Sequence, residues 1–236
     1  MDQSGQEGRA EIVEFRNNMF MEQIKGQQGS LPPTACQAGD DQFTLFGKGY
    51  WSEKAKKFVP STRPQKDVDV EWVYRYITSE RARVQTEELR SMMATATEQA
   101  LRDFKLREFD AVAAAGMFSR GCADGLLRRS PYAVLDFDDL SSTEEARRIQ
   151  QQLSQDANVA TALCFVSPKG RGVKWWVELP AWCADFDFAE QYATLSRYVG
   201  FYYGIEADPT GSNVNRLCFL PYDPQCFVNP KFLISK

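Results

Sequence analysis

The chain has 236 residues, of which 43% are hydrophobic, and its formal net charge is −4. This length allows one or two domains with a real hydrophobic core, and the composition excludes a collagen-like, coiled-coil or globally disordered protein. The sequence contains no histidine, which excludes a Ser-His-Asp triad, a Cys-His dyad, a histidine metal ligand and imidazole acid–base catalysis. Any enzymatic chemistry therefore rests on carboxylate, Lys, Arg, Tyr, Ser or Cys side chains.

The six cysteines form no Cys-x-x-Cys pair, which argues against a zinc ribbon or a thioredoxin-like motif. Cys164 and Cys218 lie within apolar runs, where cysteine behaves as a small buried hydrophobe. This usage indicates a reducing, cytoplasmic location. The first residues are polar, and no apolar run approaches the roughly 20 residues of a membrane span. We therefore expect neither a signal peptide nor a membrane segment.

The chain is expected to divide into an N-terminal extension, residues 1–66, and a main domain, residues 67–236. Within the extension, residues 1–10 are expected to be frayed and residues 15–24 to form a short helix. Residues 26–41, rich in Gly, Gln and Pro, are expected to form a loop.

The end of the extension is basic and aromatic. Residues 46–66 hold six basic residues and one acidic residue. The interleaved aromatic residues are Phe46, Tyr50, Trp51 and Phe58. This pattern suits an arm that contacts nucleic-acid backbone or bases. It equally suits a solvated connector whose aromatic side chains pack back on the body, and the composition alone favours the connector.

The main domain begins with helices and continues with short strands. Residues 68–104 show helical spacing of apolar side chains with a break near 78–83, which predicts two helices, and 111–117 is predicted as a strand. Beyond these, we predict strands at 131–138, 159–166, 172–179 and 216–220. Helices are predicted at 141–155, which opens with an N-cap in Ser141-Ser-Thr-Glu-Glu, and at 185–203, which Gly204 closes. The order β-α-β-β-α-β is that of the split βαβ, ferredoxin-like arrangement, an α+β fold with an antiparallel sheet. Many functions use this fold, so it decides none of them.

An Asp-x-Asp motif at the end of the strand 131–138 is the sharpest chemical signal. Side chains alternate along a strand, so Asp136 and Asp138 are expected on the same face. Two neighbouring carboxylates repel each other, and a divalent cation such as Mg²⁺ or Mn²⁺ resolves that repulsion with oxygen ligands. The alternative, an ordinary acidic loop in which Asp139 caps the next segment, is the commoner meaning of an isolated Asp-x-Asp.

A glycine-rich basic segment, residues 167–174, lies between the two middle strands. Gly170 and Gly172 allow a tight turn and close approach of a ligand. The positive side chains of the segment are Lys169, Arg171 and Lys174, and no acidic residue lies between Phe165 and Trp176 in the sequence. Backbone N–H groups beside such cations suit a triphosphate. The alternative is a hairpin loop whose charges face water.

A third carboxylate, Asp208, follows the last helix, and Arg216 opens the last strand. Ordinary turn chemistry would also explain both residues. In a split βαβ sheet, however, this region, the Asp-x-Asp strand end and the glycine segment face one another. Such a constellation suits two-metal nucleotidyl transfer.

Together these motifs resemble the archaeo-eukaryotic primase superfamily. They are most similar to its primase-polymerase branch in bacterial mobile elements, the VirE N-terminal-like domain, whose members are often fused to a helicase and sometimes CRISPR-associated. The family pattern is Asp-x-Asp on a strand, then Ser-x-x-Gly-x-Gly-x-His, then an Asp and an Arg-initiated strand ending in Tyr-Asp-Pro. The corresponding residues here are Asp136, Asp138, Ser167 to Lys174, Asp208, Arg216 and Tyr222-Asp223-Pro224. The likeness covers about residues 70–225.

The resemblance implies a role for each matched residue. The metal ligands and catalytic residues for two Mg²⁺ or Mn²⁺ ions would be Asp136, Asp138 and Asp208. The nucleotide-binding residues would be Ser167, Lys169, Gly170, Arg171, Gly172, Lys174 and Arg216, with Lys105 and Arg120 as further candidates. The motif often ends in His, where this chain has Lys174. A lysine can contact phosphate but cannot accept a hydrogen bond as an imidazole does.

The resemblance also implies a helical N-terminal half packed on the ferredoxin-like half, with residues 67–236 as the catalytic domain. The implied activity is template-directed DNA priming or polymerisation from NTPs or dNTPs on single-stranded or primed DNA. A helicase or a CRISPR or mobile-element protein would be a partner, and a membrane would not. The alternatives are a catalytically silent replication-initiator or RNA-recognition-like binding domain and a metal-dependent nuclease. Of Trp175 and Trp176, one is expected in the core and the other suits stacking on a base or the nucleotide, although a core position is the commoner role for either one taken alone.

Overall fold

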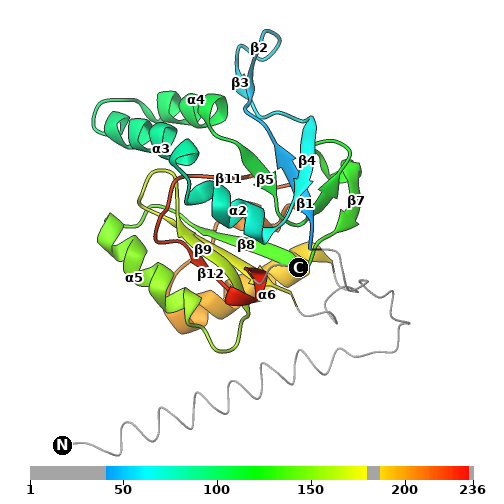
Figure 1. Ribbon diagram of the computed structural model, residues 1–236, viewed down its shortest axis with the longest axis vertical. Helices are drawn as coiled ribbons and strands as arrows, with labels where there is room; N and C mark the ends of the chain where they lie inside the picture. The colour runs from blue at the N-terminus through cyan, green and yellow to red at the C-terminus, as the bar shows by residue number, and fades with distance from the viewer. Residues whose placement is uncertain (1–40, 180–186, 234–236) are drawn as a thin grey trace, which may run out of the picture. The chain divides into compact units, whose positions relative to one another are not determined.

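The computed structural model describes residues 41–179 and 187–233, which form a mixed α+β structure (Figure 1). The predictions for residues 1–10, for 15–24 and for all but the last residue of 26–41 lie outside this part of the chain. Within it there are five α-helices: α2 (Val70–Ile77), α3 (Glu80–Met92), α4 (Glu98–Glu108), α5 (Thr143–Ser154) and α6 (Phe188–Tyr203). None of the described helices is both long and apolar enough to cross a membrane.

Two four-stranded sheets carry these helices. The first sheet has the order β11-β5-β1-β4, formed by Cys218–Phe219, Ala111–Ala113, Phe43–Phe46 and Pro64–Val68. The second has the order β12-β9-β10-β8, formed by Phe227–Val228, Thr161–Val166, Val173–Glu178 and Tyr132–Phe137. Two small hairpins complete the strands: β2 (Tyr50–Ser52) with β3 (Lys57–Val59), and β6 (Gly116–Phe118) with β7 (Leu126–Arg129). All the described pairings are antiparallel.

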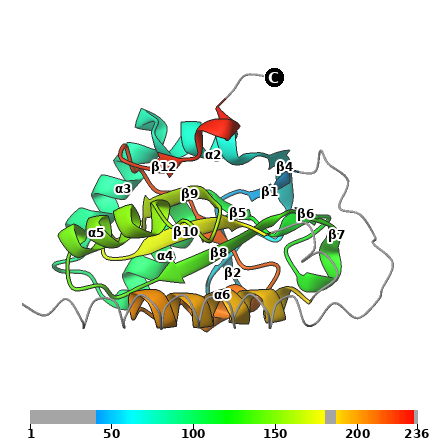
Figure 2. The same cartoon turned by 90° about the horizontal axis from the view of Figure 1, so that it is seen from below.

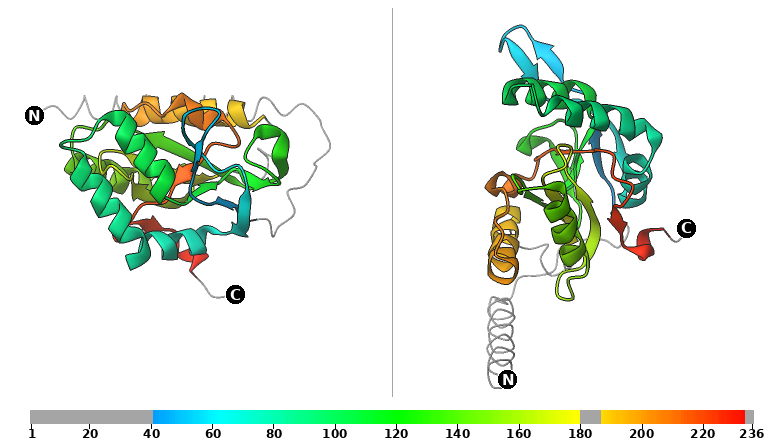
Figure 3. Two further views of the ribbon diagram at one scale, coloured as in Figure 1. Left: turned by 90° about the horizontal axis from the view of Figure 1, so that it is seen from above. Right: turned by 90° about the vertical axis from the view of Figure 1, so that its left-hand side faces the viewer.

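The second sheet is a central layer with both faces covered. Helices α5 and α6 lie on one face, and the first sheet with α2 lies on the other (Figure 2; Figure 3, right). The core on the latter side is aromatic: the Phe43 ring packs edge-on against Trp176 and Tyr132, with centroid separations of 5.2 and 5.9 Å. Because both faces are covered, β9 is buried at every position and β10 at every position but its last, without alternation.

The split βαβ prediction is confirmed for the first strands and wrong for the last. Strand β10 pairs antiparallel with both β8 and β9, so β8 and β9 are parallel with β10 inserted between them, as the predicted order requires. Strand β11, however, pairs with β5 of the first sheet, so the second sheet is not completed as a ferredoxin-like sheet. Asp208 makes one backbone hydrogen bond to the free edge of β8, and the chain then enters the 3₁₀ turn Pro209–Ser212 instead of continuing as a strand.

Several local signals behaved as expected. The Ser142 hydroxyl accepts a hydrogen bond from the Glu145 N–H and caps α5. Helix α6 ends at Gly204 in the left-handed conformation, with φ of 66°. The predicted break in the helical region is at Thr78 and Ser79, between α2 and α3. The separate start of α4, at the Thr97 cap, was missed.

Other expectations are corrected. The strand predicted at 111–117 is two strands, β5 and β6, separated by Ala114 and Ala115. Trp175 and Trp176 are both fully buried, so neither stacks on a base. The Trp175 indole N–H donates to the Thr161 hydroxyl on the neighbouring strand.

The described cysteines, Cys122, Cys164, Cys218 and Cys226, are free. Cys164 and Cys218 are buried as expected for small apolar side chains. Burial raises the pKa of both thiols.

Candidate active site

The Asp-x-Asp motif lies at the end of β8, next to the last turn of the β9–β10 connection. Asp136 is half-buried within the strand, and Asp138 is exposed just beyond its end. The two carboxylates face the same side, as the alternation of side chains along a strand predicts. Residue Asp139 is next in the chain and lies in the left-handed region, with φ of 57°, which turns the chain away and keeps its side chain out of the pair.

Asp208 joins this pair from a distant part of the sequence. Its backbone N–H donates to the Asp136 carbonyl oxygen at the free edge of β8, with an N···O distance of 2.8 Å. Its own carbonyl accepts from the Tyr192 hydroxyl of α6 at 2.6 Å. One carboxylate oxygen from each of Asp136, Asp138 and Asp208 lies within 4.8 Å of the other two. We call these three residues the acidic cluster.

Two cations already partner this cluster. Lys174 lies directly opposite Asp136 in the β8–β10 ladder and forms an ion pair with it, although the lysine is buried. Burial alone would lower the pKa of Lys174, but the nearby Asp136 outweighs burial and holds that pKa above its usual value. Arg216 donates to Asp208 Oδ2 at 2.8 Å. Lys174 therefore contacts a carboxylate in the position where the family pattern often has His.

Asp138 is the carboxylate of the cluster with the fewest neighbouring groups to balance its charge. Within the described residues, no ion pair or hydrogen bond reaches its side chain. Partial desolvation and the neighbouring charge of Asp136 raise its pKa. Asp208 differs, because hydrogen bonds from Thr210 and the charge of Arg216 outweigh its partial burial and lower its pKa.

One oxygen of the cluster fits a bound cation. Oδ1 of Asp136 is buried and has no hydrogen-bond partner in the described structure. A buried carboxylate oxygen without a donor is costly, and a divalent cation held by oxygen ligands would satisfy it. A cavity of about 20 Å³, lined by Asp136, Lys174 and Arg216 among others, adjoins the cluster and has room for one water-sized group. The residues present therefore fit Mg²⁺ or Mn²⁺.

The glycine segment lies beside the cluster, as expected. The Ser167 N–H donates to the Gly172 carbonyl and the Gly170 N–H to the Ser167 carbonyl, which closes a tight turn. Gly170 has φ of 80°. A Cβ on Gly172 would lie 2.6 Å from the Phe137 carbonyl oxygen and 3.2 Å from Asp138 Oδ1, so the turn touches the strand that carries the acids.

Helices α3 and α4 hold the other side of this glycine turn. Lys169 forms an ion pair with Glu98 of α4 at 2.6 Å. On the opposite side, Arg171 Nε donates to the carbonyl of Leu140, which follows β8, at 3.0 Å. Arg90 of α3 donates to the carbonyl oxygens of Pro168 and Ser167 at 3.1 and 3.4 Å. Sequence reasoning missed Arg90 and Glu98, because helical spacing alone says nothing of a contact some seventy residues away.

Of the two further candidate residues, Lys105 lies near the cluster and Arg120 does not. Lys105 of α4 lies near the cluster: burial and the charges of Lys169 and Lys174 lower its pKa, and Asp138 and Asp136 act against that shift. Arg120 is exposed on the turn after β6, and no described contact joins its side chain to the cluster. The structure brings Lys105 to the site and does not do so for Arg120.

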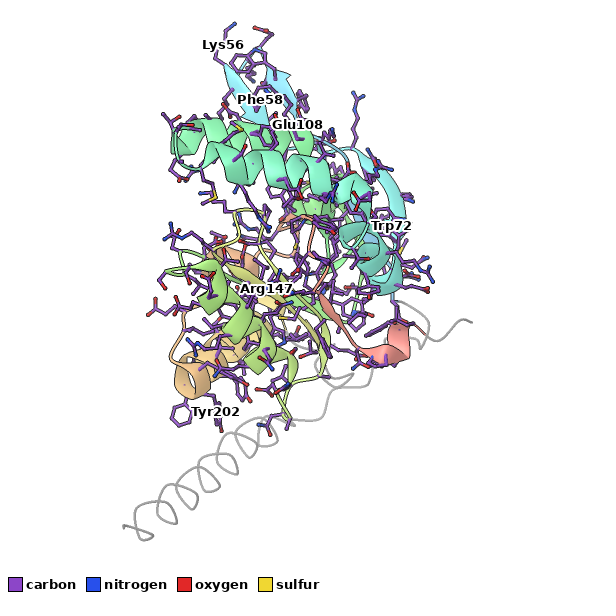
Figure 4. The ribbon with its side chains drawn as sticks, turned by 60° about the vertical axis from the view of Figure 1, so that its left-hand side comes forward. Lys56, Phe58, Trp72, Glu108, Arg147 and Tyr202 are labelled. Atoms are coloured by element: carbon purple, nitrogen blue, oxygen red, sulfur yellow. The ribbon has the colours of Figure 1, made fainter. Side chains whose placement is uncertain are left out.

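The Tyr-Asp-Pro motif is structural. Asp223 is fully buried, and its carboxylate accepts from the Val166 N–H at 2.7 Å and pairs with both terminal nitrogens of Arg147 on α5 (Figure 4 labels Arg147). Its N–H donates to the Ile77 carbonyl of α2. Asp223 thus joins α2, α5 and the end of β9, and the glycine turn begins one residue beyond Val166.

The close contact at Gly172 predicts a local effect. Gly172→Ala is expected to lower the stability by about 1–3 kcal/mol and to weaken Mn²⁺ binding, because the new methyl group pushes against the Phe137 carbonyl. Chemical denaturation and calorimetric Mn²⁺ titration measure the two effects. The control is Gly200→Ala in α6, where a Cβ meets nothing closer than 3.9 Å. That variant is expected to gain about 0.5–1 kcal/mol. Equal stability for the two variants would contradict the prediction.

An acidic cluster beside a cationic glycine turn defines a protein suited to cations and phosphates. Residues 105–227, more than half of the chain, match the sequence model of the BT4734-like N-terminal domain. The chain therefore belongs to this family, a VirE N-terminal-like domain linked to primase-polymerases of mobile elements. No curated protein and no solved structure gives a significant match.

Proposed function

We propose that this chain is a metal-dependent nucleotidyltransferase that extends a DNA strand on a template, as a primase or polymerase does. The observation that carries the proposal is the convergence of Asp136, Asp138 and Asp208, from two distant segments, around a buried carboxylate oxygen without a partner. The family link to primase-polymerases supports the same class of reaction.

The three carboxylates would hold two Mg²⁺ or Mn²⁺ ions, which would supply Lewis-acid activation of the attacking hydroxyl and charge stabilisation on the triphosphate. The chain's own residues do the rest. Asp208 is fixed against β8 by its backbone hydrogen bond, so the ligand geometry is set before a substrate arrives. Lys174 and Arg216 limit the repulsion among the acids while the site is without cations.

The glycine turn and its surroundings would hold the nucleotide. Lys169, Arg171 and Lys105 are cations on the side of the cluster formed by this turn and α4. For Lys169, binding a triphosphate means exchanging the exposed Glu98 carboxylate for a phosphate oxygen. This exchange costs little, because an ion pair with an exposed partner contributes about 0–1 kcal/mol. A phosphate with two charges is the stronger partner.

The direct test is an extension assay. We expect the wild-type chain, with Mn²⁺, a single-stranded DNA template, a labelled primer and NTPs or dNTPs, to lengthen the primer. Excess EDTA is expected to reduce extension to background, because the carboxylates alone cannot activate the hydroxyl. Absence of extension in Mn²⁺, even from a primer, would overturn the proposal. Shortened products in place of longer ones would identify a nuclease that uses the same acids.

A second candidate, a catalytically silent nucleic-acid-binding domain, is favoured by one observation. Two of the three acids already have cationic partners, Lys174 and Arg216, so the cluster is partly neutralised without a metal. Such a domain would bind an oligonucleotide, show no heat of Mn²⁺ binding and extend no primer. Calorimetric titration with Mn²⁺ alone separates it from the enzyme.

A further inference from the structure

The β2–β3 hairpin exposes two large aromatic side chains. Tyr50 and Trp51 are 54% and 47% exposed, whereas Phe46, just before the hairpin, is fully buried in the core. The expectation that these aromatic residues pack back on the body is therefore correct for Phe46 and wrong for Tyr50 and Trp51. In Figure 4 the hairpin, marked by Lys56 and Phe58, extends beyond α4 away from the sheets.

The exposed indole packs against a neighbouring ring. Trp51 lies opposite Phe58 in the hairpin ladder, and their rings meet edge to face at 5.6 Å and 73°. Such a pair restrains the ring while leaving part of its π surface open to solvent. A restrained, exposed indole loses little entropy when a flat ligand stacks on it.

The same hairpin is basic in a chain with a net negative charge. Residues 48–59 contain four lysines and one glutamate, a formal net charge of +3, whereas the whole chain has a formal net charge of −4. The glutamate, Glu53, pairs with Lys56 at the tip. Lys54 and Lys57 have no ion-pair partner in the described part of the chain. The ladder pairs Ser52 with Lys57, so Lys57 shares one face of the hairpin with Tyr50, and the Trp51–Phe58 pair lies on the other face.

The base of the hairpin is anchored to the helix that reaches the acidic cluster. The Gly49 N–H donates to the Leu106 carbonyl at 2.6 Å, and Lys48 pairs with Glu108 at 3.1 Å. Both partners are in the last turn of α4, the turn that also carries Lys105. The base of the hairpin is thereby tied to the helix that carries Lys105.

We propose that the β2–β3 hairpin, residues 48–59, binds single-stranded nucleic acid that passes around it, with bases stacked on Trp51 on one face and on Tyr50 on the other and with phosphates contacted by Lys54 and Lys57. Alternating cations and aromatic side chains are the chemistry that recognises unpaired bases without sequence preference. The hairpin lies outside the segment matched to the family, so family membership does not assign this surface. The proposed role as a template-holding surface rests on the proposed function, but the binding itself needs no metal.

Binding to a fluorescein-labelled 20-nucleotide oligothymidylate, measured by fluorescence anisotropy in EDTA, tests the proposal. Trp51→Ala is expected to raise Kd about tenfold, the usual loss for one stacked base. The double variant K54A/K57A is expected to weaken binding and to reduce the slope of log K against log salt by about 1.4, since each phosphate contact on a single strand contributes about 0.7. A 20-base-pair duplex is expected to compete poorly, because its bases are already stacked.

The controls remove exposed groups elsewhere. Leu127→Ala deletes an apolar side chain that is 68% exposed on β7, and Arg148→Ala deletes a cation on α5 whose side chain is 61% exposed. Both are expected to keep Kd within about twofold of wild type. All the variants change exposed side chains, and thermal melting checks that each is folded.

The outcomes separate this proposal from the proposed function. Wild-type Kd values in both Trp51→Ala and K54A/K57A, or no binding by the wild-type chain, would overturn the hairpin proposal. Asp138→Asn is expected to bind the oligothymidylate as wild type does, because it leaves the hairpin intact. Normal hairpin-dependent binding without any primer extension would overturn the enzymatic proposal and leave the hairpin proposal standing.

Discussion

Asp138→Asn is expected to reduce primer extension at least about a hundredfold and to remove the heat of Mn²⁺ binding in calorimetry. The substitution deletes a ligand charge worth several kcal/mol of transition-state stabilisation, at about 1.4 kcal/mol per tenfold in rate. Stability should not fall, because Asp138 is exposed, has no partner in the described structure and is close to the like charge of Asp136.

The structure favours Asp138 over Asp136 for this test. Removing the Asp136 carboxylate would leave Lys174, whose side chain is only 8% exposed, without its ion-pair partner. Loss of activity in that variant would therefore mix catalysis with misfolding. Asp139→Asn is the matched control, because it changes the adjacent acid, lies outside the cluster and places Asn in a left-handed conformation that Asn tolerates. If Asp138→Asn retained wild-type extension, the acidic cluster would not be the catalytic centre.

Asp223→Ala is expected to cost about 3 kcal/mol of folding free energy, which corresponds to a fall of roughly 10 °C in Tm for a domain of this size. The substitution leaves Arg147 without its bidentate partner and the Val166 N–H without an acceptor, at a position with no exposure to solvent. Urea denaturation measures the loss as a lower midpoint with an unchanged m-value.

A surface pair of the same chemistry is the control for this loss. Glu71 pairs with Arg75 one turn later on α2, where the arginine side chain is 71% exposed. Glu71→Ala is expected to cost less than about 0.5 kcal/mol. A similarly small cost for Asp223→Ala would show that Asp223 does not join α2, α5 and β9 in the way the hydrogen bonds indicate.

The parts of the fold that sequence reasoning predicted depend on local signals. The cap at Ser142, the left-handed end at Gly204 and the apolar strand before Asp136 are each specified by a few adjacent residues. The shared face of Asp136 and Asp138 follows from strand geometry alone. Asp208 was placed through the order of motifs, and the structure does bring it to the pair.

The parts that were missed depend on contacts distant in sequence. Strand β4 reads Pro-Gln-Lys-Asp-Val and is exposed except at its last residue, as an edge strand can be, so no apolar alternation reveals it. Strand β1 is buried at all four positions and shows no alternation either. The two-residue β11 is too short for its sequence to select between two sheets.

The site itself shows the same division. The residue types and spacing of the glycine turn were readable, but its attachment to Arg90 and Glu98 was not. The pairing of Lys174 with Asp136 is a matter of register between β8 and β10, which only the assembled sheet determines. Asp223 belongs to the Tyr-Asp-Pro end of the family pattern and so stands beside the active-site motifs in the sequence, whereas its burial shows a structural role.

The way Asp208 reaches the cluster bears on how tolerant the chain is to insertions and deletions. Asp208 caps a short 3₁₀ turn beside the edge of β8, and within the described residues no strand ladder includes it. Lengthening or trimming the stretch after Gly204 therefore leaves every strand in register. A single residue added between Asp136 and Asp138 would instead rotate one carboxylate to the opposite face of the sheet. Insertions and deletions among natural variants should accordingly accumulate in the stretch after Gly204 and be absent between Asp136 and Asp138.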